Sequence, residues 1–130
     1  MDARVQRLKK LLVLQEQLKA MHELRHAGFV AGAIAAKQEA AEIADRFNAD
    51  DSMSGLFPEV YQRRIASALA REDANLQSAG REAANVAAAN ARTNMVERNW
   101  REARGADERQ RGDRERLEII GHRPMKPGAK

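Results

Sequence analysis

The feature that most constrains this chain is one cluster of helix-terminating residues, at positions 48–58, between two long stretches with helical periodicity. Asn, Asp and Ser side chains satisfy backbone groups left over at helix ends, Gly relaxes the backbone, and Pro is tolerated in a first turn. The cluster therefore predicts the end of one helix, a turn at residues 48–57, and the start of a second helix.

The two flanking stretches have apolar residues at steps of three and four, which is the period of a helix and not of a strand. The first stretch, residues 3–47, contains no proline. Its apolar stripe is Val5, Leu8, Leu11, Leu12, Leu18, Met21, Phe29, Ala36, Ala40, Ile43 and Phe47. The second stretch is expected to be helical from about residue 58 to residue 120. Its stripe is Tyr61, Ile65, Ala68, Leu76, Ala79, Ala83, Val86, Asn90, Thr93, Val96 and Trp100.

One connection between two long helices predicts an all-α fold, a long antiparallel two-helix coiled-coil hairpin. The composition favours this fold over a globule. Hydrophobic residues make up 43% of the 130 residues but aromatic residues only 4%, so large core-filling side chains are scarce. A coiled coil needs few of them, because each helix buries only a narrow stripe. Prolines and glycines in residues 121–130 predict a flexible basic tail after the hairpin.

A turn near Ser52 sets the register of such a hairpin. Residues then face each other when their numbers sum to about 104, which places Leu8 near Val96. The first helix would run out opposite Trp100, so residues 101–116 are expected to project as a highly charged helix without a partner. A polar helix of this kind is marginal unless a partner binds it.

The chain contains no cysteine, which excludes disulfides, thiolate catalysis and cysteine-based metal sites. The longest apolar run, residues 27–36, is well short of the roughly 20 residues that a membrane span needs. The start of the chain is charged and does not have the pattern of a secretory signal. We therefore expect a cytoplasmic protein without membrane insertion. A second copy covering the alanine-rich face would give a dimeric bundle.

The segment His22-Glu23-Leu24-Arg25-His26 matches the H-E-x-x-H pattern, in which two imidazoles one helical turn apart bind zinc and the glutamate acts as general base. A catalytic zinc also needs a third protein ligand and a cleft, and a two-helix hairpin supplies no concave pocket. We predict that the chain is not an enzyme and has no cofactor. His22 and His26 are candidates for adventitious metal binding, and a zinc-dependent hydrolase is a distant alternative.

Nucleic-acid association is the alternative function from a different class. The basic residues that would contact phosphates are Arg101, Arg104, Arg109, Arg111, Arg114 and Arg116. Interleaved acidic residues nearly cancel their charge, which disfavours this interpretation. A separate apolar patch is predicted at the turn end of the hairpin, where it either plugs the coiled coil or forms a hot spot for a partner. This tip patch consists of Phe47, Leu56, Phe57 and Tyr61.

The layout resembles the FliJ/YscO group of bacterial flagellar and type III secretion proteins. The resemblance rests on the leucine-rich basic start at 4–12, the hairpin break at 50–58 and the charged end at 98–116. It implies a cytoplasmic coiled-coil stalk whose paired terminal helices enter the central hole of a hexameric export ATPase, and which also contacts the export gate and chaperones. By electrostatic complementarity with an acidic ring lumen, the partner-binding residues would be Arg4, Arg7, Lys10, Trp100, Arg101 and Arg104.

Overall fold

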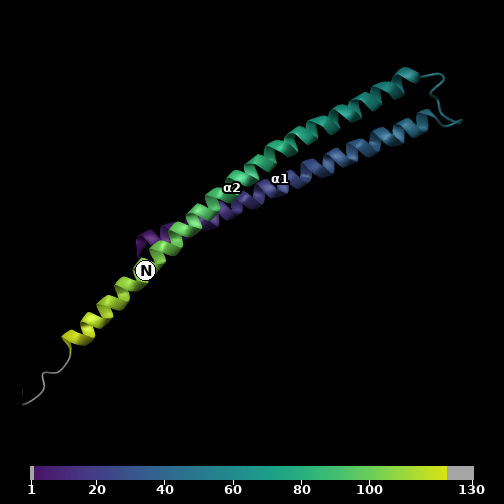
Figure 1. The fold of residues 1–130 in the computed structure, drawn as a ribbon. Helices are drawn as coiled ribbons and strands as arrows, with labels where there is room; N and C mark the ends of the chain where they lie inside the picture. Colours follow the sequence, from purple (N-terminus) through teal and green to yellow (C-terminus); the bar gives the residue numbers. More distant parts are fainter. Residues whose placement is uncertain (1, 123–130) are drawn as a thin grey trace, which may run out of the picture. The chain divides into compact units, whose positions relative to one another are not determined.

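The computed structural model describes residues 2–122, which form two helices and no strand. Helix α1 spans Ala3–Phe47 and helix α2 spans Pro58–Gly121 (Figure 1). The two helices pack against each other as an all-α helical hairpin, which confirms the predicted fold class. Neither helix combines the length and the apolar character that crossing a bilayer would require. Of the predicted basic tail, Gly121 is the last residue of α2, and residues 123–130 lie outside the described residues.

Each of two structural units contains a part of both helices. The terminal unit comprises residues 2–16 and 91–122 of the described chain, and the loop unit comprises residues 17–90. In the loop unit, α1 and α2 run antiparallel and are joined by the turn (Figure 1).

Two serine hydroxyls terminate α1. Ser54 Oγ donates to the carbonyl oxygen of Phe47 at 2.8 Å, and Ser52 Oγ donates to the same oxygen at 3.3 Å. This carbonyl is one of those that a helix end leaves without an intrahelical partner. The chain then enters α2 at Pro58, whose fixed backbone angle suits a first helical position. The backbone amide of Met53 donates to the Tyr61 hydroxyl at 3.3 Å, which ties the turn to α2.

In the loop unit, the residues facing the partner helix follow an unbroken heptad repeat, with alternating steps of three and four. In α1 these buried or half-buried positions are Lys19, His22, His26, Phe29, Ala33, Ala36, Ala40, Ile43 and Phe47. In α2 they are Tyr61, Ile65, Ala68, Glu72, Asn75, Ala79, Glu82, Val86 and Ala89. Small side chains let the helices approach closely. A Cβ atom built on Gly32 would lie only 3.1 Å from Nδ2 of Asn75.

The predicted apolar stripe is therefore wrong in the middle of α1. Met21 is 36% exposed, whereas the neighbouring His22 is half-buried. The same shift occurs in α2, where Leu76 is 53% exposed and Asn75 is half-buried. The apolar residues at both ends of each helix fix the heptad phase, so an inward Met21 would require a break in the repeat. The heptad repeat continues without a break, and polar residues therefore lie in the interior.

The interior of the terminal unit is formed by larger apolar side chains. Its buried residues are Val5, Leu12, Thr93, Val96 and Ala103. Leu8, Gln15 and Trp100 are half-buried beside them. The side-chain oxygen of Gln15 is buried and accepts no hydrogen bond from residues 2–122. This unit therefore follows the same heptad geometry as the loop unit but fills it mainly with aliphatic side chains.

The point at which α2 loses its partner lies further along the chain than predicted. Ala103 is only 8% exposed, and Val5 lines a hollow with Arg104 and Asp107. Residues 101–107 are thus paired, and the exposed part of α2 is 108–121, where every residue except Gly112 is exposed. The reason is that helical side chains tilt towards the helix N-terminus. Side chains in the first turns of α1 therefore cover α2 beyond the level of their own backbone.

Candidate functional site

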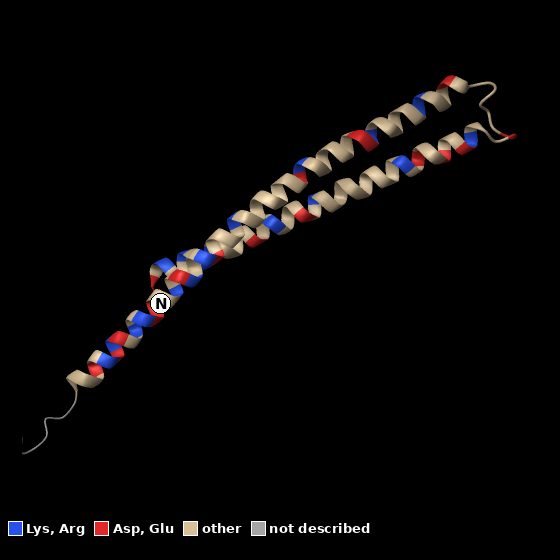
Figure 2. Cartoon of the chain, viewed as in Figure 1, with Lys and Arg blue, Asp and Glu red and all other residues tan. Residues whose placement is uncertain are grey.

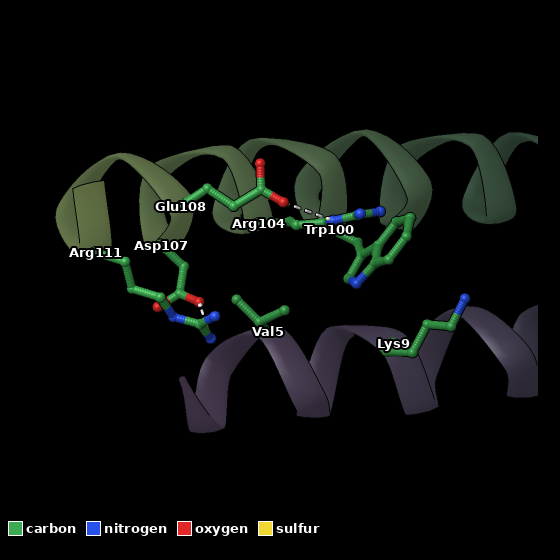
Figure 3. Close-up of a pocket in the computed structure, with 7 residues that line it drawn as sticks. All are labelled: Val5, Lys9, Trp100, Arg104, Asp107, Glu108 and Arg111. Atoms are coloured by element: carbon green, nitrogen blue, oxygen red, sulfur yellow. Dashed lines mark hydrogen bonds and ion pairs between the residues drawn. The ribbon is translucent and has the colours of Figure 1, made fainter. Parts of the chain in front are cut away.

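The terminal unit contains a hollow of about 350 Å³ between the start of α1 and the middle of α2 (Figure 3). Val5 and Lys9 reach it from α1. The residues that line it from α2 are Trp100, Arg104, Asp107, Glu108 and Arg111. Both Val5 and Trp100 are inward heptad positions, so the coiled-coil repeat itself positions the apolar part of the hollow.

Two cations lie over the Trp100 ring. Lys9 Nζ is 4.5 Å from the ring centroid, and the guanidinium carbon of Arg104 is 5.4 Å from it. The ring quadrupole attracts a cation within about 6 Å, an interaction of about 0.5–1 kcal/mol at exposed sites. The half-buried indole therefore holds positive charge at this end of the hairpin.

The six predicted partner-binding residues all belong to the terminal unit, but the five cations among them are not equivalent. Arg4, Arg7 and Lys10 are exposed, and none of them forms an ion pair with residues 2–122. Arg101 is bonded to Glu97 at 2.6 Å, and Arg104 is bonded to Glu108 at 3.1 Å.

Lys9 contacts Trp100 but is not among the partner-binding residues predicted from the sequence, which include its neighbour Lys10 instead. The two lysines are adjacent and chemically identical, so composition does not separate them. Heptad phase does separate them. Lys9 directly follows the inward position Leu8, whereas Lys10 lies further round towards solvent.

The last part of α2 neutralises most of its own charge (Figure 2). Three intrahelical ion pairs follow one another along it: Arg104–Glu108, Asp107–Arg111 and Asp113–Arg116. Pairs of this kind stabilise an exposed helix by about 0.3–0.5 kcal/mol each. They also occupy three of the six guanidinium groups that nucleic-acid binding would require, those of Arg104, Arg111 and Arg116, which weakens that alternative.

The loop unit contains a polar layer around Glu82. His22 Nδ1 and Glu82 Oε2 are 2.7 Å apart, and Arg25 Nη1 lies 4.0 Å from Glu82 Oε1. His22 and Glu82 are both inward heptad positions, and Glu82 is 9% exposed. A polar pair at such positions favours one register over its alternatives.

The hydrogen bond with His22 lowers the pKa of Glu82 below its ordinary value of 4.5. Burial opposes this effect, while a hydrogen bond with Asn85 and the charges of His22 and Arg25 lower the pKa further. Glu82 therefore remains ionised inside the hairpin at neutral pH.

Glu82 is a contact of the H-E-x-x-H segment that the sequence analysis did not predict. Its number and that of His22 sum to 104, as the predicted register requires. The contact engages His22 Nδ1 and leaves His26 without a direct part in it. Within residues 2–122, no group of three His, Cys, Asp or Glu side chains is arranged to hold a metal ion.

The structure divides the predicted tip patch into two parts. The Phe47 and Tyr61 rings pack edge to face, with centroids 5.9 Å apart, and both residues are half-buried. Leu56 and Phe57 are 72% and 54% exposed. The first pair therefore plugs the end of the coiled coil, and the second pair forms an apolar surface on the turn.

No known protein family, curated protein or solved structure matches this chain.

Proposed function

We propose that this chain is a non-enzymatic coiled-coil stalk or adaptor of a flagellar or type III protein export ATPase, and that it acts in the cytoplasm. The observation that carries the proposal is the arrangement of side chains in the terminal unit. There, the two paired helices present a half-buried tryptophan and cations that form no ion pair within residues 2–122, and α2 continues beyond them as an exposed helix.

Three features support a protein partner at this end. The exposed cations Arg4, Arg7 and Lys10 surround the start of α1. Tryptophan and arginine are enriched among interface residues that contribute most to affinity. The exposed part of α2 has no packed apolar face of its own to hold it, so burial against a partner would stabilise it. The export gate and chaperones are further partners that this proposal includes.

The experiment that tests the proposal combines the purified chain with the hexameric export ATPase of the same organism and measures the mass of the complex by size exclusion with light scattering. A single central hole admits one hairpin, so we expect one chain per hexamer. Arg7→Glu should weaken the complex, because it reverses a charge at the docking end. The control is Arg63→Glu, an arginine of the loop unit that is also exposed, which should bind as the unaltered chain does.

The proposal would be abandoned if no complex formed, or if the hexamer bound several chains around its outside. Salt-sensitive retention of DNA or RNA, with no ATPase binding, would instead support the nucleic-acid alternative.

A further inference from the structure

We propose that the hollow beside Trp100 binds the carboxylate of a Glu or Asp side chain from the partner protein. The Lys9 ammonium would hold the carboxylate, and the aliphatic part of the side chain would lie on the indole and Val5. This inference rests on the proposed function, since it concerns the same end of the hairpin, and it names the chemistry recognised there.

The charges in the hollow favour one extra carboxylate. Arg104 is bonded to Glu108, and Arg111 is bonded to Asp107 at 3.2 Å. Lys9 forms no ion pair with residues 2–122, and its ammonium is held over the Trp100 ring instead. Among the three cations that line the hollow, Lys9 is therefore the one whose charge is not already matched by a carboxylate of the described chain.

The shape and polarity of the hollow fit a side chain with an apolar stem and an anionic end. Val5 is 2% exposed and the Trp100 ring is half-buried, which together give an apolar wall. Figure 3 shows Lys9 on α1 directed towards the indole of α2. A volume of about 350 Å³ lies at the lower end of the range of small-ligand pockets, about 300–1,000 Å³. An ion pair formed against such a wall is less screened than one in open water.

The same residues disfavour a phosphate. Asp107 and Glu108 line the hollow and would repel a group that carries more than one negative charge. Their bonds to Arg111 and Arg104 also occupy the guanidinium groups that bind phosphate in two-pronged fashion. One ammonium that residues 2–122 leave unmatched fits one carboxylate. A nucleic-acid phosphodiester also carries a single negative charge, but the guanidinium groups that would grip it are occupied, so the hollow favours a carboxylate side chain.

Trp100 is the only tryptophan of the chain, so its fluorescence reports on this hollow without labelling. The experiment titrates the full chain with a capped hexaglutamate peptide, and separately with a capped hexaglutamine peptide and a short thymidine oligonucleotide. We expect a saturable change in emission with hexaglutamate that salt weakens, and no saturable change with hexaglutamine.

Matched variants of adjacent lysines locate the effect. Lys9→Met should weaken hexaglutamate binding about tenfold, and Lys10→Met by less than about twofold, because Lys9 and not Lys10 lies over the Trp100 ring. Lys9→Arg should retain most of the binding, which separates loss of charge from loss of folding. Circular dichroism of each variant verifies that the helices are intact.

Several results would overturn the inference. Equal losses in Lys9→Met and Lys10→Met would show diffuse attraction and no site. Tighter binding of the oligonucleotide than of hexaglutamate would indicate phosphate recognition. Absence of any response to hexaglutamate would reject the carboxylate site but leave the proposed function to be judged by the ATPase complex, so the two failures are distinguishable.

Discussion

The terminal unit and the loop unit share one heptad geometry but fill it with different side chains. Around Val96 and Leu12, the terminal unit buries aliphatic groups, as an ordinary coiled coil does. The loop unit instead packs alanines such as Ala68, which is fully buried, and places the polar pair His22–Glu82 in its interior. The difference shows that helical pairing can rest either on buried apolar area or on close approach combined with a specific hydrogen bond.

The two units also differ in what they present to a partner. The terminal unit has a hollow with an aromatic wall and a cation, Lys9, that forms no ion pair in the described part of the chain. In the loop unit, several polar groups instead bond to each other across the two helices, as in the 2.6 Å bond between Arg71 and Glu39. Polar residues thus contribute to pairing in one unit and remain available for recognition in the other.

The largest effect is expected from Val96→Asp, which places a charge in the apolar interior of the terminal unit. Val96 is 6% exposed. An unpaired charge at such a position should lower the free energy of unfolding by about 3–5 kcal/mol. The measurement is urea unfolding followed by circular dichroism. The control is Met95→Asp, where the native side chain is 54% exposed and a change within about 0.5 kcal/mol is expected. Similar losses in both variants would show that the terminal unit has no apolar interior.

A pair of glycine substitutions tests close approach in the loop unit. Gly28→Ala meets no atom within 4 Å, so the higher helix propensity of alanine should stabilise the chain by about 0.5–1 kcal/mol. Gly32→Ala would place a Cβ 3.1 Å from the Asn75 side chain and should gain less, because that side chain must move. Thermal unfolding of both variants gives the comparison. Equal gains would mean that the helices are not tightly packed at Gly32.

The smallest change at neutral pH is expected from Glu82→Gln, which retains an acceptor for His22 but removes the charge. Because the folded pKa of Glu82 is lowered, its contribution to stability is present above the ordinary value of 4.5 and is lost as the pH falls through the folded pKa. The native chain should therefore lose stability in that acidic range more steeply than the variant. Unfolding temperatures measured from neutral pH down to acidic pH test this. Parallel curves for the two proteins would contradict it.

The helical hairpin could be predicted from the sequence because its determinants are local. Residues that stop a helix act on the backbone beside them, and the Ser52 and Ser54 hydroxyls bond the last carbonyl of α1. The polar layer could not be predicted from apolar periodicity alone. The heptad phase set by the helix ends decides which side chains point inwards, whether they are apolar or polar. His22 and Glu82 obey the register that the turn predicts, so a search of facing positions would have found them.

Other parts of the site depend on geometry that periodicity does not contain. The tilt of side chains towards the N-terminus of α1 extends the pairing to Ala103 and Asp107. The preference of Trp100 for Lys9 over Lys10 follows from the angular position of each lysine on the helix. Both details become visible only when the two helices are placed side by side.

The most direct test of the central claim, that the terminal unit is the docking end, is site-specific photo-crosslinking to the purified export ATPase hexamer. A photoreactive amino acid replaces Lys10 in one variant and Leu56 on the turn in another, both of which are exposed. We predict an ATPase crosslink from position 10 and little from position 56. A crosslink from position 56 alone would contradict the account and assign docking to the turn.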